Sequence, residues 1–160
     1  MSRLDATLAT LGIALPPAHG PAGAYLSSLE AGGFLHLGGQ VCREGGQIRY
    51  LGKVGRDVSP DEARQAARLC ALNLLAHLRA GLEGDLDRVR GCVRLNIYLN
   101  CAPGFTDFPA VADGASELMR QVLGDAGRHV RTTVGVFELP FGAAVEVDGT
   151  FEIHSPEARL

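Results

Sequence analysis

The stretch from Arg128 to Ile153 constrains the fold more than any other part of the chain. Two runs of alternating β-forming residues, Thr132–Phe137 and Ala143–Val147, lie on either side of a turn that contains Pro140 and Gly142. Alternation with a period of two is typical of strands with one buried face. We therefore expect two strands here, and the chain has to build a sheet around them.

Two amphipathic helices are indicated in the middle of the chain. Ser59, Pro60 and Glu62 form a helix start, with a capping serine, a proline in the first turn and a glutamate three residues after the cap. The apolar stripe that follows at helical spacing consists of Ala63, Ala66, Ala67, Cys70, Leu74, Leu78 and Leu82. The range Thr106–Leu123 has a similar stripe. Both stripes have to be buried, so we expect the two helices to pack on a sheet.

Three further segments, Tyr25–Ser28, Phe34–Val41 and Val89–Leu99, have the composition of strands. With the helices between them, the sequence predicts an α+β fold with two helices packed on one face of the sheet. Phe34–Val41 and Thr132–Phe137 carry apolar residues at both alternating positions, which predicts that the uncovered face is buried too. A second subunit would cover it, and ligand clefts are common at such boundaries.

Length and composition predict a single domain over residues 1–160, with an N-terminal helix and linker at 1–20 and a tail at 154–160. The net charge of −3 argues against a nucleic-acid or membrane partner. The four cysteines are widely spaced, without a metal-binding motif, so we expect reduced thiols, no metal and a cytoplasmic location.

Arg131 and Glu146 are the candidate functional residues within the stretch from Arg128 to Ile153. A guanidinium meets a carboxylate through two parallel hydrogen bonds and stays charged, so Arg131 could hold a small carboxylate substrate. Glu146 lies between two valines, where burial can adjust its ionisation for proton transfer. The alternative is that both are solvated charges on the strand surface.

The motifs resemble those of the RidA (YjgF) family of reactive-intermediate deaminases over roughly Tyr25 to Glu152. The resemblance rests on Arg131-x-x-Val-x-Val-x-x-Leu-Pro, on Val-Glu146-Val, on Gly39–Gln40 and on the Gly104–Phe108 segment that opens the second helix. It implies a chorismate-mutase-like fold, a homotrimer with clefts between subunits, and no cofactor. The reaction that it implies is the hydrolysis of 2-imino acids or enamines to 2-oxo acids and ammonia.

The resemblance also assigns roles to individual residues. Arg131 corresponds to the arginine that binds the substrate carboxylate, and Glu146 to the acid beside the imine. Tyr25 corresponds to the aromatic residue that lines the cleft. Gly39 corresponds to a glycine whose backbone N–H can reach the carboxylate, whereas Gln40 supports the strand.

The chain departs from the family pattern at three positions. Gly38 replaces a serine, Thr106 stands near the place of an asparagine, and Thr133 replaces a cysteine. The loss of the thiol keeps a rival interpretation open, in which the protein binds a small oxo acid without turnover. An endoribonuclease is a third interpretation, which the acidic net charge disfavours. His129, two residues before Arg131, is either an auxiliary acid–base or a polar residue that orients the strand entry.

Overall fold

The computed structural model describes residues 2–155. The helices are α1 (Arg3–Thr10), α2 (Pro60–Gly81) and α3 (Phe108–Leu123), with short 3-10 turns η1 (Leu86–Arg88), η2 (Gly124–Gly127) and η3 (Pro140–Gly142). The strands are β1 (Ser28–Ala31), β2 (Phe34–Val41), β3 (Arg43–Glu44), β4 (Gln47–Ile48), β5 (Val89–Asn100), β6 (Val130–Val136) and β7 (Val145–Ile153). The expected C-terminal tail lies largely outside the described residues.

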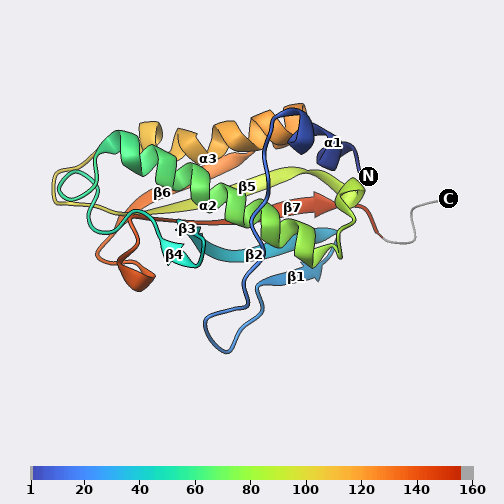
Figure 1. Ribbon diagram of the computed structural model, residues 1–160, viewed down its shortest axis with the longest axis horizontal. Coiled ribbons are helices and arrows are strands. Elements are labelled where there is room, and N and C mark those ends of the chain that lie inside the picture. The colour runs from blue at the N-terminus through green and yellow to red at the C-terminus, as the bar shows by residue number, and fades with distance from the viewer. Residues whose placement is uncertain (1, 156–160) are drawn as a thin grey trace.

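Five strands form one sheet in the order β1-β2-β7-β5-β6, and β3 pairs with β4 in a separate hairpin (Figure 1). The long strand β5 pairs antiparallel with β7 and parallel with β6. The two strands of the Arg128–Ile153 stretch are therefore not neighbours, since β5 lies between them.

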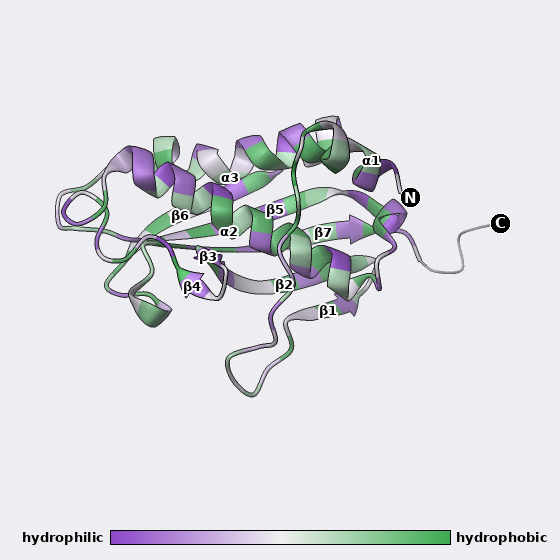
Figure 2. Ribbon diagram, in the orientation of Figure 1, coloured by the Kyte–Doolittle hydropathy of each residue, from purple (hydrophilic) through white to green (hydrophobic). Residues whose placement is uncertain are grey.

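Helices α2 and α3 lie side by side on one face of the sheet, as the apolar stripes predict (Figure 1). The capping box at Ser59 is present, with the serine side chain accepting from the backbone N–H of Glu62. Hydrophobic and hydrophilic segments alternate along both helices (Figure 2), and the buried side chains of α2 and α3 meet those of β5 and β7 in one core. The predicted α+β fold with two helices on one face is confirmed.

The predicted strand at Tyr25–Ser28 is wrong, because the strand begins at Ser28. Gly32 and Gly33 both have positive φ and form a two-residue turn between β1 and β2. Such a turn fixes the register, pairing Ala31 with Phe34 and Ser28 with Leu37. Tyr25 consequently lies in the linker that crosses α2 on its way to β1 (Figure 1).

The second helix begins at Phe108 and not at Thr106. Gly104 has a φ of +84°, Asp107 occupies the N-cap position, and Pro109 lies in the first turn. Proline is suited to the first turn of a helix because the N–H that it lacks has no partner there. Thr106 therefore stays in the loop ahead of α3.

The sheet face that the helices leave open is less apolar than the sequence suggests. Val130, Val134 and Phe34 are exposed on the outer part of this face. The inner strands β5 and β7 present polar residues there, namely Asn96, Tyr98, Glu146 and Asp148. The expectation of an apolar open face thus holds only for the outer strands. None of the helices formed by residues 2–155 is both long and apolar enough to cross a membrane.

Candidate functional site

Arg131 lies near the start of β6, on the face that α3 covers. It is paired with Leu95 of β5, a fully buried core residue, so its side chain points to the helix side of the sheet. Nη1 donates to Asp113 Oδ1 at 2.7 Å and to Ser116 Oγ at 3.0 Å, and Nη2 donates to the carbonyl oxygen of Pro109 at 3.2 Å. Three acceptors on α3 therefore orient the guanidinium. Nε donates to none of the described residues.

Thr133 follows Arg131 on the same face of β6, where it pairs with Ile97. Its hydroxyl oxygen is buried and has no hydrogen-bond partner among residues 2–155. A buried hydroxyl without a partner costs roughly 1–3 kcal/mol. Thr133 therefore has an unused donor two residues from the arginine, although the thiol of the family pattern is absent.

His129 and Ser116 form a chain of hydrogen bonds that ends at Arg131. His129 Nδ1 lies 2.7 Å from the carbonyl oxygen of Gly127, which can only accept, so Nδ1 carries the hydrogen. In the neutral ring Nε2 then accepts from Ser116 Oγ at 2.9 Å. Burial and the nearby Arg131 charge lower the pKa of His129, although the Gly127 hydrogen bond opposes them. The lowered pKa favours the neutral ring at neutral pH, in which His129 links the carbonyl oxygen of Gly127 to Ser116.

Glu146 lies on the opposite face of the sheet, between the fully buried Val145 and Val147 of β7. Its carboxylate reaches across to Gly39 in β2, where a Cβ atom would lie only 2.1 Å from Glu146 Oε1. A bulge between Leu37 and Gln40 interrupts the β2–β7 register at this point. The absence of a side chain at Gly39 is therefore what lets the carboxylate occupy this position.

The surroundings of Glu146 favour its protonated form. Burial raises the pKa of Glu146, and the negative charge of Asp148 raises it further. Asp148 itself accepts from Tyr98 Oη at 2.8 Å and from Asn96 Nδ2 at 2.7 Å, whereas Glu146 accepts no side-chain hydrogen bond within the described part of the chain. A half-buried carboxylate with a raised pKa and free acceptor sites is a candidate proton-transfer group.

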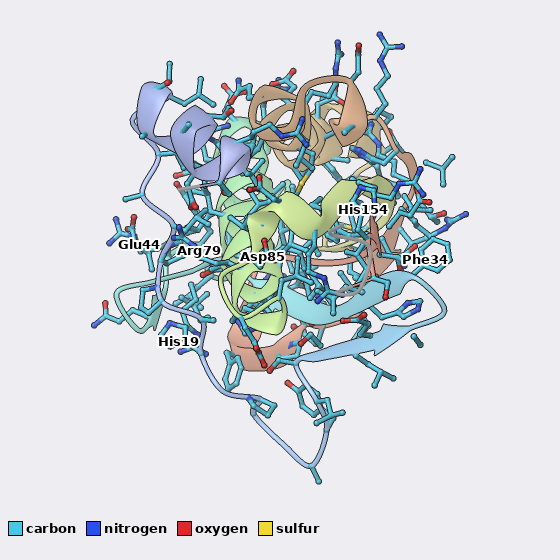
Figure 3. All side chains as sticks on the ribbon, turned by 90° about the vertical axis from the view of Figure 1, so that its right-hand side faces the viewer. His19, Phe34, Glu44, Arg79, Asp85 and His154 are labelled. Atoms are coloured by element: carbon cyan, nitrogen blue, oxygen red, sulfur yellow. The ribbon has the colours of Figure 1, made fainter. Side chains whose placement is uncertain are left out.

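Tyr25 and Gly39 line a cavity of about 230 Å³ between the N-terminal linker, α2 and the edge of β2. The ring of Tyr25 is about half exposed, and its hydroxyl accepts from the backbone N–H of Ala22 at 3.2 Å. His19 is on the linker, on the side of the molecule that carries Glu44 (Figure 3), and lines the same cavity with His77 of α2. Gln40 lines it as well.

Thr106 is exposed ahead of α3, and its side chain makes no hydrogen bond with the described residues. Its carbonyl oxygen accepts from the backbone N–H of Phe108 at 2.8 Å. The first turn of α3 does reach Arg131 through the carbonyl oxygen of Pro109. Thr106 therefore stands near this end of the helix without contacting the guanidinium.

The predicted site residues form two groups in one chain. The arginine group consists of Arg131 and Thr133 on the edge strand β6, on the helix-covered face. The glutamate group consists of Glu146 on the open face, of Gly39 beside it, and of Tyr25, which shares with Gly39 a cavity that Glu146 does not line. Since β5 separates β6 from β7, two strand spacings of about 10 Å in total lie between them. A single small ligand cannot touch Arg131 and Glu146 of the same chain.

Sequence reasoning missed the residues that orient Arg131. Asp113 and Ser116 lie three residues apart on α3 and therefore on one face of that helix. A serine in the middle of a helix usually bonds the carbonyl four residues earlier, whereas Ser116 bonds His129 and Arg131. Two polar residues at helical spacing on a helix with a large apolar stripe are the signal that could have revealed them. Within residues 2–155, no three His, Cys, Asp or Glu side chains gather as they would to hold a metal ion.

Comparison with known proteins identifies a family model that matches residues 5–147. Its description is "YjgF/chorismate mutase-like, putative endoribonuclease". This match covers the strands and helices that carry both residue groups, apart from the end of β7.

Two curated relatives and one solved structure are similar over most of their length. Protein TCP17 of Trypanosoma cruzi is 44% identical over 154 residues, which are 96% of each chain. The 2-iminobutanoate/2-iminopropanoate deaminase of Dermatophagoides farinae is 30% identical over 136 residues, covering 85% of this chain and 91% of the relative. A "putative endoribonuclease" of Shewanella oneidensis has a crystal structure with a TM-score of 0.91 and 30% identity, covering 95% of this chain and all of that one.

Proposed function

Because the chain belongs to the YjgF/chorismate mutase-like family, we propose that it hydrolyses small 2-imino acids, or their enamine tautomers, to 2-oxo acids and ammonia. The observation that carries this proposal is the orientation of the Arg131 guanidinium. Asp113 and Ser116 accept hydrogen bonds from its Nη1, whereas Nε donates to none of the described residues. The relative from Dermatophagoides farinae, a deaminase by name, supports the same reaction class.

Arg131 binds the substrate carboxylate in this proposal. A carboxylate that meets the Nε edge forms charge-assisted hydrogen bonds, which are shorter and stronger than neutral ones. Thr133 lies on the same face, but its hydroxyl oxygen is buried inside the chain, so Arg131 alone is assigned to the substrate carboxylate. The loss of the cysteine therefore leaves carboxylate binding intact.

Glu146 transfers the proton. The carbon of a protonated imine is electrophilic, so the reaction needs a positioned water and a base. Water adds to this carbon while Glu146 takes one of its protons, and Glu146 then gives this proton to the nitrogen. The C–N bond breaks as ammonia leaves, and the hydroxyl group gives its proton back to Glu146 as the carbonyl forms. Positioning can supply several kcal/mol of the reduction in the barrier. A general acid–base residue adds about 10²–10⁴-fold. The chemistry requires no cofactor.

The two residue groups have to come from different copies of the chain. Arg131 and Glu146 lie on opposite faces of one sheet, so a site that uses both is complete only between subunits. Val130 and Val134 of β6 are exposed on the open face of the sheet, opposite Arg131, and are suited to bury apolar surface against a partner. We therefore assign the site to the clefts of a homotrimer.

A binding protein without turnover is the second candidate function. Thr133 in place of the cysteine favours this candidate. The raised pKa of Glu146 opposes it, because burial of an ionisable carboxylate costs folding free energy and binding alone does not need such a group. Endoribonuclease activity is a weaker candidate for this chain. Its net charge of −3 opposes the phosphate contacts that supply most of the affinity for RNA.

A coupled assay separates the first two candidates. An amino-acid oxidase generates the imine, semicarbazide captures it, and the protein competes for it by hydrolysis. We expect the protein to lower semicarbazone formation in proportion to its concentration. Undiminished semicarbazone with every amino acid of a broad panel, together with 2-oxo acid binding in calorimetry, would instead establish the binding protein.

Replacement of Gly39 by alanine tests the contact that places Glu146. The new Cβ atom would lie 2.1 Å from Glu146 Oε1 and 2.8 Å from its Cδ, so the carboxylate has to move. A misplacement of about 1 Å can cost 10²-fold in rate, so we expect a loss of turnover of that order. Because the displaced atoms are the end of a flexible side chain, thermal unfolding should change little.

The matched control for this variant is Gly20→Ala. Gly20 lies in the linker, on the wall of the cavity that Gly39 also lines, and a Cβ atom there would meet nothing within 4 Å, so this variant adds a methyl group without displacing Glu146. The control should turn over imino acids like the wild type. Equal kinetics in Gly39→Ala and Gly20→Ala would show that the position of the Glu146 carboxylate is unimportant.

A further inference from the structure

A second cavity, of about 340 Å³, opens beside Arg131 at the junction of α3, η2 and β6. It is lined by Ser116, Arg120, Arg128, His129 and Arg131. Three of these five residues are arginines, and none is an acid. Binding sites for small molecules commonly begin at about this volume, with a few polar groups that fix the ligand. The lining therefore favours an anionic ligand.

The charges around this cavity leave two arginines available. Asp113 bonds Arg131 at 2.7 Å and neutralises part of its charge. Arg128 approaches Asp125 only at 3.5 Å, and both side chains are largely exposed. Arg120 forms no salt bridge within residues 2–155. In a chain with a net charge of −3, this local excess of positive charge is not a general property of the surface.

Helix geometry directs Arg120 toward the arginine group. Ser116 and Arg120 are four residues apart on α3, so their Cβ atoms are neighbours on one helix face, roughly 5–6 Å apart. Ser116 in turn accepts from Arg131. Arg128 comes from the other wall, just after η2 and three residues before Arg131. His129 stays neutral between them, so the arginines supply the positive charge.

A substrate with one carboxylate would use Arg131, leaving Arg120 without an anionic partner and Arg128 with only the exposed Asp125. We infer that the preferred substrates are 2-imino acids with a second carboxylate at the far end, of four or five carbons. This inference rests on the proposed deaminase function and deepens it. Arg131 holds the carboxylate next to the imine, and Arg120 and Arg128 hold the distal one. An enzyme that oxidises or dehydrogenates acidic amino acids has to supply such imines.

Calorimetry on the full chain, with 2-oxo acids as probes, tests the substrate class. 2-Oxoglutarate and 2-oxopentanoate have the same carbon chain and differ in a carboxylate or a methyl group at the end. We expect 2-oxoglutarate to bind the wild type about fivefold more tightly, the upper end of the scale for an exposed ion pair. The double variant Arg120→Gln, Arg128→Gln should lose this preference and keep its affinity for 2-oxopentanoate.

The control variant is Arg49→Gln, which removes one exposed positive charge outside the cavity. It should keep the preference. Retention of the preference in the double variant, or equal binding of both acids by the wild type, would overturn the inference while leaving the deaminase proposal intact. Inorganic phosphate, or a short single-stranded RNA, that binds as tightly as 2-oxoglutarate would overturn it as well. Failure of both oxo acids to bind the wild type would instead refute carboxylate binding at Arg131, and the proposed function with it.

Discussion

Replacement of Arg131 by alanine should abolish the binding of small 2-oxo acids while the fold remains intact. The variant loses the guanidinium that offers its free edge to the carboxylate, and a bidentate charged pair contributes a few kcal/mol, so we expect affinity to fall about 100-fold or more. Asp113 loses its partner but is about half exposed, so water can replace it. Lysine should rescue binding poorly, because an ammonium group cannot reproduce the planar fork.

Calorimetry with pyruvate measures this effect. Arg90→Ala is the matched control, because Arg90 is an exposed arginine in β5 that pairs with Glu152 and belongs to neither residue group. It should bind pyruvate like the wild type. Unchanged pyruvate binding by Arg131→Ala would remove Arg131 from the site.

Replacement of Glu146 by glutamine should lower the turnover of 2-imino acids by about 10²-fold or more, the usual scale of acid–base catalysis. Glutamine keeps the shape next to Gly39 and can still hydrogen-bond, but it cannot take a proton from water. The binding of the corresponding 2-oxo acid should change much less, since Arg131 is retained. Equal turnover by wild type and variant would exclude Glu146 as the proton-transfer group.

The same variant should show a pH-dependent gain in stability, which serves as its folding control. Burial raises the pKa of Glu146 in the folded state, so its ionisation costs folding free energy. This cost is absent well below a pH of about 4.3, the ordinary pKa of glutamate, where the carboxyl is protonated in both states, and is complete above the raised pKa. Glu146→Gln should therefore melt at a higher temperature than the wild type at pH 7, and the difference should vanish as the pH falls below the ordinary glutamate pKa.

Local signals in the sequence were sufficient for the helices. The motif of Ser59, Pro60 and Glu62 predicts the first residue of α2 correctly. The side chains of Ser59 and Glu62 accept hydrogen bonds from backbone N–H groups that have no partner within the helix, and Pro60 has no N–H that would need one. The sequence underestimates the length of β7, because the strand continues beyond Val147 through Gly149 to Ile153. A Cβ atom at Gly149 would lie 3.0 Å from side chains of Leu74 and Leu95, so this glycine allows close packing and does not end the strand.

The candidate site was predictable by residue type but not by arrangement. Arg131 and Glu146 are fifteen residues apart, and the turn between them suggests that their strands are neighbours. The insertion of β5 between β6 and β7 separates them and places their side chains on opposite faces. This strand order depends on pairing between residues distant in sequence, which no local pattern encodes. The roles of Asp113 and Ser116 were hidden for the same reason, because their partner Arg131 lies on another element.

The central claim is that Arg131 of one copy and Glu146 of another complete one site, and a mixing experiment tests it most directly. Arg131→Ala and Glu146→Gln chains, each inactive alone, are unfolded together in equal amounts, refolded and assayed for imine hydrolysis. If assembly is random in a closed ring, about one quarter of the interfaces join an intact arginine to an intact glutamate. We predict that activity recovers to about this fraction of the wild-type rate, in particles with about three times the 16.8 kDa chain mass. A mixture that assembles but stays as inactive as its components would contradict the shared site.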